Sequence, residues 1–360
     1  MSDSFRLALE QHRQGFLDQA AQLYLQVLTR QPNHADALHL LGVVAHQQGQ
    51  HAQAVGLIGH AVALEPGVAI YHANLAEVYR AMGQFDRAAG CAETALRLRP
   101  DFADPANTLG LLLLEQNQPA RAIERFKFAL SLKPESAQAW NNLGNAHRLL
   151  GGIDQALTCF RKALDIDPHL AEAHSNLGQL LLEEKQPHNA LPHCREAVRV
   201  NPHSAEAHSN LGNVLRELGR LAEAKQCYTE ALRLNPNLAM LYNNMGQALQ
   251  EEGKVHEAMA WYQRGLAIDP NLARLYCNLA TALGELDNLA DAVRCYETAL
   301  RLEPNYPEAH TGLAWIWHEQ GRYEEAQERY RLVVRLKPDF APALCNLGQV
   351  RAELGDFAEA

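Results

Sequence analysis

The sequence from residue 137 to residue 170 reads AQAWNNLGNAHRLLGGIDQALTCFRKALDIDPHL, and its pattern recurs along the whole chain. A proline stands at the same position of each complete copy, 34 residues from the next: Pro32, Pro66, Pro100, Pro134, Pro168, Pro202, Pro236, Pro270, Pro304 and Pro338. A fixed period of this length indicates one supersecondary unit copied head to tail, in which each unit buries its apolar face against its neighbours. The period predicts ten full copies and a partial eleventh, at residues 1–34, 35–68, 69–102, 103–136, 137–170, 171–204, 205–238, 239–272, 273–306, 307–340 and 341–360.

Each copy has the pattern of two helices joined by a tight turn. Counted from the first residue of a copy, position 20 is alanine in all eleven copies, and position 8 is only glycine or alanine. Such small residues let two helix backbones approach closely. Position 15 is glycine in eight copies, where a left-handed residue ends one helix before the next begins. The sequence therefore predicts an all-α solenoid of helix–turn–helix repeats that forms a single domain over residues 1–360.

Four positions depart from this pattern. Asn117, Lys185 and Asp287 replace the turn glycine in three copies. Pro192 falls inside the predicted second helix of the sixth copy. Because proline removes one backbone donor and clashes with the preceding turn, we expect it to kink or shorten that helix.

The composition excludes several classes of partner. The formal net charge is −10, whereas nucleic acids and anionic membrane surfaces attract basic patches. The first 20 residues lack the apolar core of a signal peptide. No stretch approaches the roughly 18 apolar residues of a membrane span. We therefore expect a cytoplasmic protein that binds neither nucleic acid nor membrane.

The residue types that often carry chemistry recur at packing positions. Four histidines occupy position 4, where other copies have aromatic residues: His72, His174, His208 and His310. Metal ligands must converge on one ion rather than recur one copy apart, so we interpret these histidines as packing residues. The seven cysteines include no CxxC pair and fit reduced structural thiols. No nucleotide-binding loop, nucleophile elbow or zinc-protease motif occurs. We predict a chain with no catalytic residues, no cofactor and no metal.

Side-chain amides recur at fixed positions of the predicted first helices. At 100° per residue, positions 4, 7, 8 and 11 of the first helix form its core face, and positions 2, 6, 9 and 13 lie opposite. Position 6 is asparagine in seven copies, at Asn74, Asn142, Asn176, Asn210, Asn244, Asn278 and Asn346. Position 9 adds Asn145, Gln179, Asn213, Gln247 and Gln349. Position 13 carries a row of glutamates, which we interpret as solvated or facing a ligand: Glu115, Glu183, Glu217, Glu251, Glu285, Glu319 and Glu353.

Mid-helix asparagine is disfavoured by roughly 0.5–0.7 kcal/mol relative to alanine, so the amide row requires an explanation. Three interpretations stay open: the amides face solvent, they fix the stacking of neighbouring copies, or they grip the backbone of an extended peptide. The leading hypothesis is peptide binding by Asn74, Asn142, Asn145, Asn176, Gln179, Asn210, Asn213, Asn244, Gln247 and Asn278. It predicts that alanine at positions 176, 210 and 244 weakens peptide binding and preserves the fold. Four residues interrupt the position-6 row: Arg6, Leu40, Thr108 and Gly312.

The copy at residues 137–170 resembles the tetratricopeptide repeat. The residues in register with that family's motif are Trp140, Leu143, Gly144, His147, Ala156, Phe160 and Pro168. The Asn-Leu-Gly triplets at 142–144, 176–178 and 210–212 are similar to the repeat region of O-linked N-acetylglucosamine transferases. That resemblance implies a right-handed superhelix, lined inside by the first helices, whose asparagine ladder holds protein substrates. Repeats of this kind also resemble those fused to sulfotransferase domains.

Two classes of function follow from the sequence. The leading one is a non-catalytic module whose concave, Asn-lined groove holds extended polypeptides. The alternative is the substrate-recognition region of a protein-modifying transferase whose catalytic domain lies beyond residue 360. A scaffold that binds partners through its convex side would instead show apolar or charged patches on the second helices. We also expect Leu347 and Phe357 to be poorly covered, so that the chain self-associates through its C-terminal end.

Overall fold

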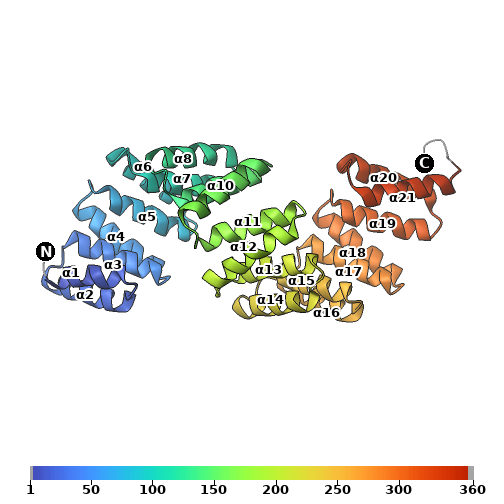
Figure 1. Cartoon of the computed structure of the whole chain (residues 1–360), viewed down its shortest axis with the longest axis horizontal. Helices are drawn as coiled ribbons and strands as arrows, with labels where there is room; N and C mark the ends of the chain where they lie inside the picture. The colour runs from blue at the N-terminus through green and yellow to red at the C-terminus, as the bar shows by residue number, and fades with distance from the viewer. Residues whose placement is uncertain (1–2, 356–360) are drawn as a thin grey trace. The chain divides into compact units, whose positions relative to one another are not determined.

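A computed structural model describes residues 3–355, and its helices follow the 34-residue period (Figure 1). These described residues form 21 helices and no strand. The prediction of an all-helical solenoid of helix–turn–helix repeats is therefore confirmed. The chain divides into two compact units, Met1–Leu180 and Leu181–Ala360, which are described one at a time. That residues 1–360 form one domain stays a prediction.

In the first unit, every complete copy contributes one first helix and one second helix that pack as a pair. The first helices are α1 (Asp3–Arg13), α3 (Ala35–Gln47), α5 (Ala69–Ala81), α7 (Ala103–Glu115) and α9 (Ala137–Leu149). The second helices are α2 (Leu17–Arg30), α4 (His51–Leu64), α6 (Phe85–Leu98), α8 (Pro119–Leu132) and α10 (Ile153–Ile166). A second helix also packs against the first helix of the next copy, and α3, α5, α7 and α9 contact one another in sequence.

The second unit repeats this arrangement, and the boundary between the units falls inside α11 (Ala171–Glu183). Its first helices are α13 (Ala205–Glu217), α15 (Ala239–Glu251), α17 (Ala273–Glu285), α19 (Pro307–Glu319) and α21 (Ala341–Glu353). Its second helices are α12 (Pro187–Val200), α14 (Leu221–Leu234), α16 (Val255–Ile268), α18 (Leu289–Leu302) and α20 (Tyr323–Leu336). Consecutive first helices from α13 to α21 contact one another, so their outward faces form one continuous surface within this unit.

The small residues lie where the two helices of a copy cross. The ten alanines at position 20 within the described residues are fully buried. In four copies the glycine at position 8 faces an aromatic ring at position 24 of the same copy, and Gly42 faces Ile58 there instead. A Cβ atom on Gly144 would lie 2.6 Å from Cε1 of Phe160, and one on Gly246 would lie 2.3 Å from Cε1 of Tyr262. Both predicted close-contact positions are confirmed, and the side chain at position 24 explains why position 8 is small in these copies.

The turn between the two helices has a left-handed residue at position 15. All eight glycines there have φ between 69° and 83°. Asn117, Lys185 and Asp287 adopt the same conformation, with φ of 56°, 59° and 59°. The packing of the two helices therefore imposes this turn even where the sequence supplies a side chain.

Replacing Lys185 with glycine is expected to raise the free energy of unfolding by about 1 kcal/mol. The left-handed region costs a residue with a Cβ atom roughly 1–2 kcal/mol, and the Lys185 side chain is exposed. Asn117→Gly is the control with a smaller expected gain, because asparagine visits this conformation readily. Thermal unfolding followed by circular dichroism measures both changes. A lower melting temperature for Lys185→Gly would contradict the expectation.

Two expectations about the departures from the pattern need correction. α12 keeps the 14 residues of the other second helices although Pro192 lies inside it, so the expected shortening is wrong, whereas the expected kink stays a prediction. Leu347 is only 8% exposed and packs with Tyr330 and Val350, so the expected poor cover is wrong for this residue. Phe357 and the start of the second helix of the eleventh copy lie outside the described residues.

Candidate functional site

The position-4 side chains hold the loop that precedes each first helix. A ring nitrogen or hydroxyl donates to the carbonyl of the repeat proline six residues earlier. The pairs are His72–Pro66 (2.9 Å), Trp140–Pro134 (2.9 Å), His174–Pro168 (3.1 Å), His208–Pro202 (3.0 Å), Tyr242–Pro236 (2.9 Å) and His310–Pro304 (2.9 Å). The histidines are thus structural donors as well as packing residues. The signal in the sequence was that position 4 holds His, Trp or Tyr, each of which can donate one N–H or O–H hydrogen.

Several position-6 amides connect their first helix to the first helix of the preceding copy. In five copies Nδ2 donates to a side chain at position 5 or 9 of the preceding copy. The bonds run from Asn74 to His39 Nε2 (2.7 Å), Asn142 to Asn107 Oδ1 (3.0 Å), Asn176 to Asn141 Oδ1 (2.9 Å), Asn244 to Asn213 Oδ1 (3.0 Å) and Asn278 to Asn243 Oδ1 (2.7 Å). We call these ten residues the amide ladder, and the surface of each unit on which they lie is the ladder face of that unit.

The ladder supports the stacking interpretation for one Nδ2 hydrogen of each of these five asparagines. Thr108 continues it, because its hydroxyl donates to the Glu77 carboxylate at position 9 of the preceding copy. The expected interruption at Thr108 is therefore wrong. For Asn74 and Asn278, neither Oδ1 nor the second Nδ2 hydrogen has a partner among the described residues. The ladder thus leaves hydrogen-bonding capacity for a ligand.

The remaining predicted site residues take several roles. Asn213 accepts a second bond from the Tyr228 hydroxyl (2.9 Å). Gln247 accepts from Nδ2 of Asn243 (3.3 Å). Oδ1 of Asn145 is buried and has no partner among the described residues. Gln179 and Asn210 are half-buried at positions 9 and 6 of α11 and α13.

Replacing Asn142 with alanine is expected to lower the free energy of unfolding by about 1–2 kcal/mol, because Asn107 Oδ1 loses its donor. The same reasoning for Asn176 and Asn244 revises the expectation that their alanine variants keep full stability. The matched control is Asn145→Ala in the same helix. Alanine there removes a buried acceptor without a partner and improves helix propensity, so no loss is expected. Urea unfolding compares the two variants, and equal losses would contradict the ladder.

A second row of contacts lies near the C-terminal ends of the first helices, where position 12 donates to position 13 of the next copy. Arg80 pairs with Glu115 (3.2 Å), Arg216 with Glu251, Gln250 with Glu285 and His12 with Gln47 (3.0 Å). Glu115 and Glu251 are exposed, as the interpretation of a solvated row expected, and they also form ion pairs between copies. Donor and acceptor are 35 residues apart in each of these contacts, as they are in four ladder bonds. This spacing in the sequence could have predicted the contacts between copies.

Where the ladder passes over α5, α7 and α9, its side chains line a pocket of about 270 Å³. Asn74, Asn107 and Thr108 form part of the lining. Glu77 and the exposed Gln138 stand beside them. Polar groups of the ladder therefore border open space that protein atoms do not fill.

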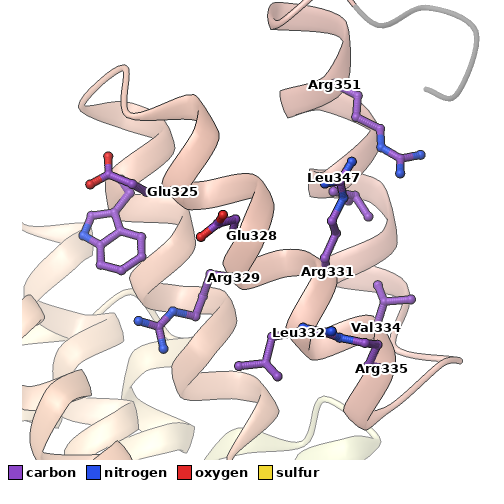
Figure 2. Close-up of a pocket in the computed structure, with 10 residues that line it drawn as sticks. Glu325, Glu328, Arg329, Arg331, Leu332, Val334, Arg335, Leu347 and Arg351 are labelled. Atoms are coloured by element: carbon purple, nitrogen blue, oxygen red, sulfur yellow. The ribbon is translucent and has the colours of Figure 1, made fainter.

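A different pocket of about 840 Å³ is lined by residues of α19, α20 and α21 (Figure 2). Its charged lining consists of Glu325, Glu328, Arg329, Arg331, Arg335 and Arg351. The guanidinium of Arg329 also lies 5.0 Å from the ring centre of Trp317. The pocket stands beside the last described helix, and we assign it no ligand.

The buried thiols have the properties of structural residues. Burial raises the pKa of Cys159 to about 11 and that of Cys194 and Cys277 to about 12. A thiol with such a pKa is a poor nucleophile at neutral pH. Within residues 3–355, no group of three or more His, Cys, Asp or Glu side chains is placed to hold a metal ion. None of the helices in this range is long and apolar enough to cross a membrane.

Family models describe most of the chain. One model, a tetratricopeptide repeat, matches residues 5–67, 107–171, 150–205, 277–339 and 319–360. The chain belongs to the tetratricopeptide repeat family. Four further models of these repeats match residues 205–238, 246–287, 69–102 and 227–260. Tetratricopeptide repeat solenoids are typically non-catalytic, and membership implies a role in protein–protein interaction.

Three solved structures contain chains to which this chain is similar. The Cut9–Hcn1 hetero-tetramer of the APC/C matches at a TM-score of 0.55 and 16% identity, over 97% of this chain and 96% of that chain. PilF of Pseudomonas aeruginosa matches at a TM-score of 0.49 and 23% identity, over 61% and 98%. MamA matches at a TM-score of 0.39 and 25% identity, over 45% and 95%. At this identity the Cut9–Hcn1 likeness supports the fold alone. No curated protein sequence matches this tetratricopeptide repeat chain.

Proposed function

We propose that the ladder face binds extended polypeptides and that this chain acts as a non-catalytic binding module. The observation that carries the proposal is the pocket of about 270 Å³ bordered by Asn74, Asn107 and Thr108. A side-chain amide offers one acceptor and two donors, which match the C=O and N–H groups of a peptide backbone. The unused Oδ1 atoms of Asn74 and Asn278 supply such groups.

The stacking bonds support binding rather than compete with it. Each bond to the preceding copy fixes the conformation of its asparagine before any ligand arrives. Ordering a flexible side chain on binding costs roughly 0.5–1.5 kcal/mol, and a preorganised side chain avoids this cost. The ladder thus presents amides at regular intervals in fixed orientations. Because the amides are neutral, we expect affinity to depend little on salt.

The test uses a fluorescent, uncharged 20-residue peptide of Gly, Ser and Thr, with binding measured by fluorescence anisotropy. The double variant Gln138→Ala/Asn145→Ala removes two side-chain amides of α9. Gln138 is exposed, and Oδ1 of Asn145 has no partner among the described residues. At about 1 kcal/mol for each lost hydrogen bond, its affinity should fall about tenfold or more. The ladder bond from Asn142 to Asn107 remains in this variant, so its melting temperature should stay close to that of the wild type.

The matched control is Phe128→Ala, which removes an exposed apolar side chain from the second helix α8. We expect it to leave peptide affinity unchanged. If Phe128→Ala weakens binding and the α9 double variant does not, the partner surface lies on the second helices and the proposal is wrong.

The second proposal assigns the same ladder face to the substrate-recognition region of a protein-modifying enzyme. The Asn-Leu-Gly triplets that resemble O-linked N-acetylglucosamine transferases suggest that the ladder holds substrates for a protein-modifying enzyme. Asn142 and Asn176, the first residues of two triplets, are ladder donors and would serve both roles.

A further inference from the structure

The amide ladder ends at Gly312, and a pocket of about 730 Å³ opens there over α17, α19 and α21. This position is occupied by asparagine in seven other copies. Three aromatic residues and two carboxylates line the pocket: Tyr296, Trp315, Phe340, Glu285 and Glu308. The amide of Asn346 also lines the pocket, but the aromatic and acidic side chains make it differ in chemistry from the amide-lined remainder of the ladder face.

The sequence of the ninth and tenth copies explains the opening. Ala280 stands at position 8, where glycine in other copies lies under the ring at position 24. The ring of Tyr296 instead lies against position 6 of the next copy, because a Cβ atom on Gly312 would be 2.2 Å from its Cζ atom. The Tyr296 hydroxyl is held by Thr281 Oγ1 at 3.0 Å. The absence of a side chain at Gly312 thus leaves the ring of Tyr296, a residue that is itself only 5% exposed, as the floor of the pocket.

Trp315 forms a wall of the pocket. It occupies position 9, where other copies carry amides, and it remains 38% exposed. A Cβ atom on Gly284 would lie 3.5 Å from its Cζ3 atom, so the indole packs against the backbone of α17. A large aromatic surface is therefore held in place and is still accessible.

The two carboxylates of the pocket carry uncompensated negative charge. Glu285 accepts from the neutral amide of Gln250, and Glu308 forms no ion pair among the described residues. No lysine or arginine lines the pocket. Arg274, at position 2 of the preceding copy, interacts with Tyr306. An aromatic wall beside two unpaired carboxylates favours a cation.

We propose that this pocket binds an arginine side chain of a polypeptide held on the ladder face of the second unit. A planar guanidinium stacks on an indole and donates to carboxylates at the same time, which the compact ammonium of lysine does less well. The pocket would then set the register of a polypeptide that the neutral amides bind without regard to sequence. This inference rests on the proposed function only in its assumption that the arginine belongs to an extended chain.

The experiment compares two fluorescent peptides of Gly, Ser and Thr that carry either one arginine or its neutral analogue citrulline at the centre. We expect the wild-type protein to bind the arginine peptide about tenfold more tightly. The double variant Glu285→Gln/Glu308→Gln should reduce this ratio to about one, and Trp315→Ala should reduce it severalfold. Circular dichroism confirms that each variant is folded.

The control is Glu206→Gln/Glu217→Gln, which removes the same charge from positions 2 and 13 of the seventh copy. It should preserve the tenfold preference. Equal affinities of the wild type for the two peptides would overturn the proposal, as would a preference that survives in both pocket variants. A preference lost equally in the control would show a general effect of charge and would also overturn it.

The outcomes separate this inference from the proposed function. If the citrulline peptide does not bind at all and the arginine preference still depends on Glu285, Glu308 and Trp315, the pocket stands and the amide-based function fails. If both peptides bind equally and the α9 double variant weakens both, the function stands and the arginine pocket fails.

Discussion

Replacing Pro192 with alanine is expected to raise the free energy of unfolding by about 3 kcal/mol. Pro192 is exposed in the interior of α12, where any other residue would donate its backbone N–H to the carbonyl of His188. Proline lacks this hydrogen and its ring clashes with that carbonyl, which together cost about 3 kcal/mol in a helix interior. The helix keeps its full length because it packs against α13.

The reciprocal variant sharpens this prediction. Gln226 is the exposed residue at the same position of α14, and Gln226→Pro should lower stability by about 3 kcal/mol or more. Gln226→Ala is the matched control and should change stability by less than about 0.5 kcal/mol. Because proline also restricts the unfolded chain, alanine at position 192 could lose up to about 1 kcal/mol of its gain.

Urea unfolding measures all three variants, and amide hydrogen exchange locates the change. Since each repeat contacts only its neighbours, the change in protection should be greatest in the copy that carries the substitution and in those beside it. An unchanged stability for Pro192→Ala would mean that α12 has already relaxed around the proline at no cost.

Acidification is expected to destabilise the first unit through His39. This side chain is 4% exposed, and burial lowers its pKa from 6.5 to about 4, with a smaller upward effect of Asp36 and a further downward effect of His12. Its Nε2 atom accepts from Asn74, so the folded state requires the unprotonated nitrogen. The stability that neutral His39 contributes is fully present above pH 6.5 and is lost as the pH falls toward 4. The pKa difference corresponds to at most about 3 kcal/mol.

The variant His39→Asn tests the origin of this pH dependence. Other copies place asparagine at position 5, and Asn107, Asn141 and Asn243 accept the same ladder bond. The variant should therefore keep the bond from Asn74 and lose its share of the pH dependence. Unfolding by urea between pH 4 and pH 7 compares the two slopes. His60→Asn, at an exposed position of α4, is the control. If His39→Asn and the wild type lose the same stability on acidification, another group is responsible.

The sequence by itself determined the helices, their turns and their order. Small residues at positions 8 and 20 and a left-handed residue at position 15 act within a single copy, so their effects repeat with the 34-residue period. Lys185 shows the strength of this local determination, because its register alone placed it in the left-handed turn against its own preference.

The sequence also supplied the amide row but not its hydrogen bonds. A position-6 asparagine facing solvent, a ligand or the next copy gives the same pattern along the chain. Only the spacing of consecutive first helices brings Asn278 Nδ2 to within 2.7 Å of Asn243 Oδ1, 35 residues away. The ion pairs of Glu115 and Glu251 were missed for the same reason, since Arg80 and Arg216 approach these glutamates from the preceding copy.

Only the tertiary structure shows what replaces the ladder bond where position 6 is not asparagine. Thr108 and Gly312 both break the asparagine row in the sequence, yet Thr108 continues the ladder through Glu77 whereas Gly312 opens the aromatic pocket. The difference depends on the ring of Tyr296, which belongs to the preceding copy and reaches Gly312 across the interface between two helices. The local sequence determines the backbone of each repeat. Which side chains line a site between two repeats depends on how those side chains pack against one another, and they come into contact only when the repeats stack.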